Sequence, residues 1–221
     1  MDLRPHCPPA YNQKSLPTCS SNAIAAAVEF DLMKETGKRA PMPSRLFLFY
    51  NSRAMERTEH SRNLEQGVYI RDAIKALVRH GDCPEKIWPY IEHRVLTRPP
   101  KRCYAAARKY RVVEYYRLHR NLEDMRACLA SGYPFVFGFL AHEKFRTVVK
   151  HTGVLDMPAP REGVIGKHAV LAVGYEQPLR RLIVRNSWGP KFGLSGYFTM
   201  PYDYLTNVDY SADFWTVRLV S

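Results

Sequence analysis

The first half of the chain carries apolar residues at helical spacing, interrupted by polar stretches that contain Gly and Pro. Helical segments are predicted over residues 19–36, 43–50, 69–80, 99–110 and 121–131. In the third segment the apolar positions would share one face: Ile70, Ala73, Ile74, Leu77 and Val78. Gly37, Gly81 and Gly132 follow three of the segments and are suitable helix ends. Residues 56–65 are predicted to form a polar loop.

Beyond Gly132 the pattern changes to short apolar runs typical of strands. Strands are predicted over residues 134–140, 168–175, 182–184, 196–200 and 214–220. Helices therefore precede strands along the chain, and this order predicts an α+β fold in one domain, residues 1–221. We place the boundary near residue 115, between a helical lobe (about residues 10–115) and a β lobe (about residues 116–221).

Length and charge limit the classes of function. With 221 residues the chain can bury a large core as one domain, and we expect a monomer. The formal net charge is +12, and residues 94–126 hold ten Lys or Arg side chains against three acidic ones. A solvated basic face is the simplest interpretation, and an acidic partner is the alternative. No nucleic-acid recognition motif accompanies the charge.

The cysteines and the apolar runs bear on the compartment. The five cysteines lack the spacing of a disulfide or zinc framework, which favours a reducing compartment such as cytoplasm, a host cell interior or a virion. We expect neither a metal nor another cofactor. No apolar run approaches the roughly 18 residues of a membrane span, so no membrane partner is predicted. His119, His142 and His151 fit no motif and are interpreted as surface or loop residues.

The strongest candidate chemistry lies in residues 12–27, where a turn-rich stretch delivers Cys19 to the start of the first predicted helix. Unpaired N–H groups and the positive end of the helix dipole would favour the thiolate, which is the reactive form of cysteine. Gln13 could fold back and donate to an oxyanion, with the Cys19 N–H group as second donor. Taken alone, this segment also fits a small buried cysteine.

Two distant segments favour a catalytic cysteine over a small buried one. Residues 166–175 read GKHAVLAVGY and place His168 at the head of a strand, and residues 185–198 read RNSWGPKFGLSGYF and place Asn186 at the end of another. With Gln13 and Cys19, these residues resemble the papain-like (C1 family) cysteine peptidases. In that family, Gln and Cys near the N-terminus precede His-Ala-Val and Asn-Ser-Trp-Gly in this order. The resemblance extends over nearly all of the chain.

The resemblance implies a papain-like two-lobed fold, with a helical left lobe, an antiparallel β right lobe and the active site in the cleft between them. An extended N-terminal arm, residues 2–9, would cross between the lobes and belong with the β lobe. The implied activity is hydrolysis of peptide bonds in a protein or peptide substrate through a thioester acyl-enzyme. Cys19 would be the nucleophile, His168 its acid and base, Asn186 the residue that orients His168, and Gln13 an oxyanion donor.

Four further residues are implied around the cleft: Trp188, Gly67, Ala169 and Gly138. Trp188 would shield the contact between the catalytic His and Asn from water. Gly67 would let the substrate backbone approach, although a glycine at a helix start explains it equally well. Ala169 and Gly138 match two wall positions of the pocket for the second residue before the cleaved bond.

The segment around Cys19 departs from the family pattern. The usual Cys-Gly-Ser-Cys-Trp is Leu-Pro-Thr-Cys-Ser in residues 16–20, so a disulfide cysteine and a Trp are replaced. Two other functions stay open: a papain-like binding module without catalysis, and a thiol acyl transferase or deamidase that uses the same residues. Residues 83–90, CPEKIWPY, resemble a Tyr-Pro-Tyr-like turn of the family, and Trp88 and Tyr90 are interpreted as core residues.

Overall fold

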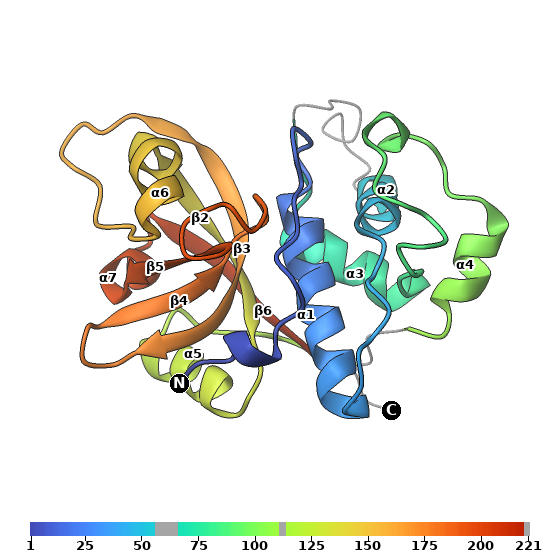
Figure 1. Cartoon of the computed structure of the whole chain (residues 1–221), viewed down its shortest axis with the longest axis horizontal. Helices are drawn as coiled ribbons and strands as arrows, with labels where there is room; N and C mark the ends of the chain where they lie inside the picture. Colours follow the sequence, from blue (N-terminus) through green and yellow to red (C-terminus); the bar gives the residue numbers. More distant parts are fainter. Residues whose placement is uncertain (56–65, 111–113, 219–221) are drawn as a thin grey trace.

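The structure is a computed structural model that describes residues 1–55, 66–110 and 114–218. The loop predicted over residues 56–65 lies outside the described residues, as does the end of the strand predicted over residues 214–220. Figure 1 shows a helical part and a sheet-containing part side by side. The helices of the described chain are α1 (Cys19–Thr36), α2 (Arg45–Met55), α3 (Ile70–His80), α4 (Lys101–Ala107), α5 (Leu122–Ala130), α6 (Lys150–Thr152) and α7 (Tyr202–Thr206). Shorter helical turns are η1 (Arg4–His6), η3 (Glu92–Arg94) and the π-helical η4 (Phe145–Val149).

Within the described residues, every pairing between the named strands of the sheet is antiparallel. Its strands are β1 (Glu114–Arg117), β2 (Phe135–His142), β3 (Val164–Glu176), β4 (Arg181–Arg185), β5 (Tyr197–Pro201) and β6 (Ser211–Arg218). Their order is β1-β6-β2-β3-β4-β5. The long strand β3 therefore lies beside β2, and its register places His168 opposite Phe139 and Ala169 opposite Gly138. Helices followed by an antiparallel sheet confirm the predicted α+β fold class.

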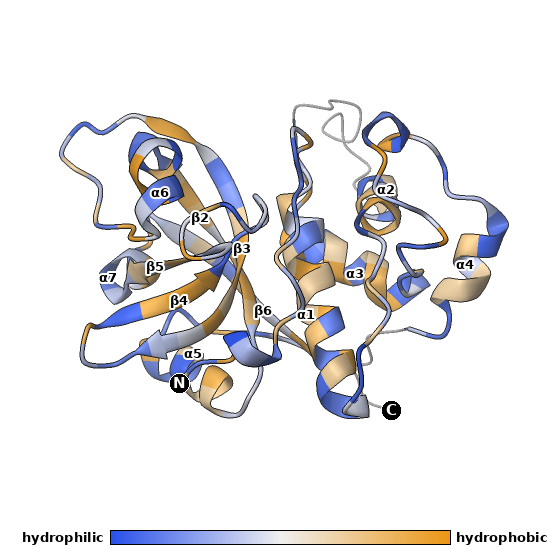
Figure 2. Ribbon diagram, in the orientation of Figure 1, coloured by the Kyte–Doolittle hydropathy of each residue, from blue (hydrophilic) through white to orange (hydrophobic). Residues whose placement is uncertain are grey.

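Helix α1 lies at the junction of the two parts and contacts both of them (Figure 1). It packs against β2, β3 and β6 on the sheet side and against α2 and α3 on the helical side. Every residue from Ser20 to Asp31 is buried, and four of them are alanines whose small side chains let neighbouring elements approach closely. Hydrophobic residues concentrate on the strands and on the helices at this junction, whereas the outer loops are mostly hydrophilic (Figure 2). The core therefore surrounds α1.

The ends of the helices follow the signals in the sequence. Gly37 ends α1 in the left-handed conformation with a φ of 62°. Gly81 follows α3, and a Cβ atom there would lie 2.0 Å from the carbonyl oxygen of Ala107, so only glycine fits. Asn121 caps α5 by accepting a hydrogen bond from the Glu123 N–H group. These three predicted boundaries are confirmed.

Several parts of the backbone differ from prediction, and η4, α6 and α7 are among those that were not predicted. Strand β1 was not predicted, because all four of its residues are exposed and carry no apolar alternation. The N-terminal arm is not fully extended: residues Arg4–His6 form η1, and the Asp2 carboxylate accepts hydrogen bonds from the Arg4 N–H and guanidinium groups. The arm still joins the sheet, since the Leu3 N–H group donates to the Val173 carbonyl at 2.8 Å.

The interpretation of His142 as a surface residue is wrong. Its side chain is buried at the end of β2, and its Nδ1 atom lies 2.8 Å from the Tyr204 hydroxyl. Burial is possible because this hydroxyl satisfies the ring nitrogen inside the protein. His119 and His151 are exposed, as expected.

The lobe boundary near residue 115 stays a prediction, since α1 shares its contacts between both parts. No helix within the described ranges combines the length and the apolar character that crossing a bilayer requires.

Candidate active site

Cys19 occupies the first position of α1, directly after the buried Thr18 that precedes the helix. The residue as a whole is partly exposed. Burial raises the pKa of this thiol, but the neighbouring His168 ring and the backbone N–H groups of Ala169 and Ser20 outweigh burial, so the pKa is lowered. A thiol in this place forms its thiolate more readily than an ordinary cysteine.

The other cysteines contrast with Cys19. Burial raises the pKa of Cys7 to about 11. Burial also raises the pKa of Cys83 and of Cys103, both of which are inaccessible to solvent. Of the thiols with a shifted pKa, Cys19 alone is shifted toward the thiolate, and all five cysteines are unpaired. Among these thiols, the environment of Cys19 is therefore the one that favours the thiolate.

The imidazole ring of His168 is fixed by Asn186, at the turn after β4. The Nε2 atom of His168 lies 2.8 Å from the Oδ1 atom of Asn186. This Oδ1 atom also accepts a hydrogen bond from the Ser187 N–H group at 2.8 Å, which sets the orientation of the amide. Because Oδ1 can only accept, Nε2 carries the hydrogen, and Nδ1 is left for the Cys19 thiol.

Aromatic rings surround this histidine. The ring of Trp188 lies 5.2 Å from the ring of His168, centroid to centroid, and the rings of Phe139 and Phe145 each lie 5.8 Å away. Phe145 also packs on Trp188 at 5.0 Å. Rings in these positions exclude water, and a hydrogen bond in such surroundings is stronger than one in water.

Gln13 is held by the segment that follows Asn186. Its backbone N–H group donates to the Ser187 carbonyl at 2.8 Å, and its side-chain Oε1 accepts from the Ser187 hydroxyl at 2.6 Å. One N–H of its amide donates to the Leu16 carbonyl at 2.9 Å, which leaves the second N–H for an oxyanion. The structure thus gathers Gln13, Cys19, His168 and Asn186 from three distant segments. Their catalytic roles stay predictions at this point.

Gly67 lies beside the loop that leads to Cys19. A Cβ atom at Gly67 would lie 3.1 Å from the Pro17 carbonyl oxygen, and the next residue, Val68, accepts a hydrogen bond from the Ser20 hydroxyl at 2.7 Å. Gly67 itself is exposed. A substrate backbone can therefore approach it from solvent.

The predicted pocket residues lie on neighbouring strands. Ala169 follows His168 on β3 and pairs with Gly138 on β2. A Cβ atom at Gly138 would meet the Ile70 side chain at 3.9 Å and the Ala212 carbonyl at 3.6 Å. Binding roles for Ala169, Gly138, Gly67 and Trp188 stay predictions.

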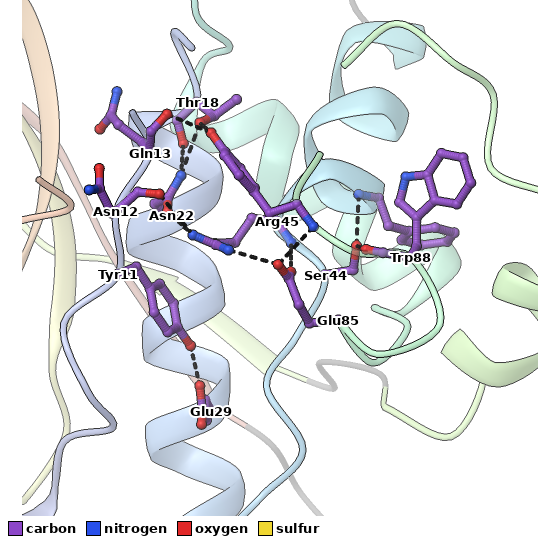
Figure 3. A network of polar contacts seen from close by, with 12 residues as sticks. Tyr11, Asn12, Gln13, Thr18, Asn22, Glu29, Ser44, Arg45, Glu85 and Trp88 are labelled. Atoms are coloured by element: carbon purple, nitrogen blue, oxygen red, sulfur yellow. Dashed lines mark hydrogen bonds and ion pairs between the residues drawn. The ribbon is translucent and has the colours of Figure 1, made fainter. Parts of the chain in front are cut away.

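Sequence reasoning missed a polar network behind the Gln13 loop, shown in Figure 3. Arg45 at the start of α2 lies at its centre and forms an ion pair with Glu85 at 2.7 Å. Tyr90 was interpreted as core, but it is only partly buried, and its hydroxyl contacts the Gln13 carbonyl at 2.8 Å. An arginine directly before the apolar run LFLF was the available signal in the sequence.

A hollow of about 760 Å³ lies away from these residues, between α2, α3 and α4. It is lined by four cationic side chains, Arg79, Arg98, Lys101 and Arg108, together with aromatic and small residues. The basic stretch predicted over residues 94–126 supplies three of them. Within the described residues, no group of three or more His, Cys, Asp or Glu side chains is arranged to hold a metal ion.

A family profile and a related protein both connect the chain with the papain (C1) family. The profile of the papain family cysteine proteases matches residues 7–213. The uncharacterized peptidase C1-like protein L477 of Acanthamoeba polyphaga mimivirus is 38% identical over 219 residues, which are 95% of this chain and 70% of that protein.

Solved structures agree in fold. Xylellain, a cysteine protease from Xylella fastidiosa, superposes with a TM-score of 0.90 at 36% identity, covering 100% of this chain and 85% of its own. The bromelain protease from Ananas comosus, solved with the E64 inhibitor, superposes with a TM-score of 0.74 at 19% identity, covering 100% and 98%. These superpositions confirm the predicted papain-like α+β fold.

Proposed function

Because the chain belongs to the papain family of cysteine proteases, we propose that it hydrolyses peptide bonds with Cys19 as the nucleophile. One observation carries the proposal. The pKa of the Cys19 thiol is lowered beside His168, although burial raises it, and His168 is oriented by Asn186 at 2.8 Å. A nucleophile, a base and a residue that orients the base form the arrangement expected for covalent catalysis.

The reaction proceeds in two steps. The Cys19 thiolate attacks the carbonyl carbon of the substrate, and the resulting oxyanion accepts hydrogen bonds from the free amide N–H of Gln13 and from the Cys19 N–H group. His168 then gives a proton to the leaving amine, which breaks the C–N bond and leaves a thioester. In the second step His168 takes a proton from water, and the hydroxide displaces Cys19 to release the acid.

Substrate binding uses the residues beside the nucleophile. We propose that the Gly67 backbone pairs with the substrate backbone and that Trp188 covers the His168–Asn186 contact. Ala169 and Gly138 would line the pocket for the second residue before the cleaved bond. Small residues at these two places favour a bulky apolar side chain in the substrate.

An acidic partner stays a second proposal, tied to the basic hollow between α2, α3 and α4. The cations Arg79, Arg98, Lys101 and Arg108 converge on this hollow, and none of them forms an ion pair with a carboxylate of the described residues. Such a concave cluster raises the local concentration of anionic groups.

The test is labelling by an irreversible epoxide inhibitor of papain-like enzymes, followed by intact mass measurement and peptide mapping. We expect one label per chain, on Cys19, with matching loss of cleavage of a general peptide substrate. Cys19→Ala should be neither labelled nor active, and Cys7→Ala, the control, should behave as the wild type. A folded wild-type protein that is not labelled and cleaves nothing would favour the binding module.

Product analysis separates hydrolysis from acyl transfer. Hydrolysis in water enriched in oxygen-18 places the heavy oxygen in the new carboxylate, whereas ligation to an added amine does not. Products without the heavy oxygen would favour the transferase. Deamidation would leave the peptide backbone intact.

A further inference from the structure

The loop formed by residues 12–18 connects the N-terminal arm to α1 and carries Gln13. Two successive carbonyl groups of this loop are held by side chains of the helical part (Figure 3). The Arg45 Nη1 atom donates to the Asn12 carbonyl at 3.2 Å, and the Tyr90 hydroxyl donates to the Gln13 carbonyl at 2.8 Å. The carbonyl groups of Asn12 and Gln13 are thus attached to groups that come 33 and 77 residues later in the chain, respectively.

The number of hydrogens on each group determines which group donates in each hydrogen bond of this network. A tyrosine has one hydroxyl hydrogen, and here it goes to the Gln13 carbonyl. The 2.6 Å contact between the Tyr90 and Thr18 hydroxyls must therefore have Thr18 as the donor. Thr18 in turn accepts from the Asn22 amide at 3.0 Å. Burial raises the pKa of Tyr90, so its hydroxyl keeps the proton that this chain of hydrogen bonds needs.

Tyr90 is itself fixed at its ring and at its backbone. The Arg45 guanidinium lies over the Tyr90 ring, 4.1 Å from its centroid. The Glu85 carboxylate accepts from the Tyr90 N–H group at 3.0 Å and from the Arg45 Nη2 atom at 2.7 Å. The side chains of Arg45 and Glu85 are 8% and 16% exposed. The ion pair of Arg45 and Glu85 therefore holds both the ring and the backbone of Tyr90, which fixes the position of its hydroxyl beside the loop.

We propose that Tyr90 is a positioning residue, whose hydroxyl holds the main chain of Gln13 so that the amide of Gln13 faces the oxyanion. This inference rests on the proposed function. Ser187 fixes the Gln13 amide from the sheet side at 2.6 Å, and Tyr90 fixes the Gln13 backbone from the helical side. The oxyanion donor thus depends on anchors on both sides of the site, and displacement of a donor by a fraction of an ångström weakens transition-state binding.

Tyr90→Phe is the sharpest test, because it removes the hydroxyl and keeps the ring under Arg45. We expect kcat/KM for an amide substrate to fall about tenfold, mainly through kcat, as for the loss of one buried hydrogen bond. Alkylation of Cys19 by iodoacetamide should keep the wild-type rate. That reaction displaces iodide at a saturated carbon and forms no oxyanion, so it reports on the thiolate alone.

Two further variants isolate the effect. Tyr104→Phe is the matched control, since its hydroxyl is also partly buried in the helical part and donates to the Asn51 Oδ1 atom at 3.0 Å. It should cleave at the wild-type rate. In a Gln13→Ala background, Tyr90→Phe should add less than about a twofold loss, because a residue that acts through Gln13 has nothing left to position.

Each other outcome overturns the inference. Wild-type kcat/KM in Tyr90→Phe would show that the hydroxyl positions nothing. Equal losses of cleavage and alkylation would show a general disturbance of the site, and a full tenfold loss in the Gln13→Ala background would show an effect independent of Gln13. A wild-type protein that cleaves nothing and is not alkylated at Cys19 would overturn the proposed function, and this inference with it.

Discussion

Replacing Glu85 by Gln is expected to lower the free energy of unfolding by about 3–5 kcal/mol, because it leaves the Arg45 charge buried without its partner. Arg45 is 8% exposed and Glu85 is 16% exposed, and their closest atoms are 2.7 Å apart. The substitution keeps the shape of the side chain and one acceptor oxygen. It therefore removes the charge while most of the packing stays.

The size of the effect follows from burial. At an effective dielectric constant of about 20, two unit charges about 4 Å apart attract each other by about 4 kcal/mol. An exposed pair in the same protein provides the control: Arg180 and Asp203 are 3.6 Å apart, and their side chains are 66% and 73% exposed. Asp203→Asn should cost less than about 1 kcal/mol, since water screens such pairs.

The assay is equilibrium unfolding in urea at pH 7, followed by tryptophan fluorescence. All variants carry Cys19→Ala to prevent self-digestion, and linear extrapolation gives the free energies. A double variant, Arg45→Met with Glu85→Gln, should recover part of the loss, because it leaves no charge buried. If Glu85→Gln costs no more than Asp203→Asn, the pair is effectively solvated and this reasoning is refuted.

Two further predictions concern the reaction. Gln13→Ala should lower kcat about 10²–10³-fold with an unchanged circular dichroism spectrum, as for the loss of one oxyanion donor; activity within a fewfold of wild type would remove Gln13 from the mechanism. The rate of Cys19 alkylation should fall with decreasing pH at a midpoint below that of free cysteine measured in parallel, because the lowered pKa keeps the thiolate populated at lower pH. A midpoint at or above that of free cysteine would contradict the lowered pKa.

Local patterns in the sequence were enough for most of the backbone. Helix α3 was predicted because its apolar residues repeat at helical spacing and Gly81 follows it. Strand β3 was predicted because its buried centre is a continuous apolar run. In contrast, β1 was missed, since its pairing with β6 depends on residues about a hundred positions away. Pairing over such a distance leaves no periodic signal in an exposed strand.

The same distinction applies to the site. His168 and Asn186 could be named because each lies in a short segment typical of a family, and Cys19 because it follows Gln13 and begins a predicted helix. Tyr90 and Glu85 could not, because their roles come from contacts with Gln13 and Arg45 that only the folded chain provides. Burial of His142 likewise depends on a tyrosine 62 residues later. Candidate reactive groups can be recognised in a sequence more readily than the groups that hold them in place.

The position of α1 at the junction has a consequence for biosynthesis. The segment with Cys19 leaves the ribosome before β3 and the turn with Asn186, which follow about 150 residues later. Until those strands fold against α1, Cys19 lacks the imidazole that lowers its pKa and is an ordinary thiol. A nascent chain therefore acquires the environment that lowers the pKa of Cys19 only after β3 and the turn with Asn186 have been synthesised, and a polypeptide truncated before residue 168 would contain the cysteine without that histidine.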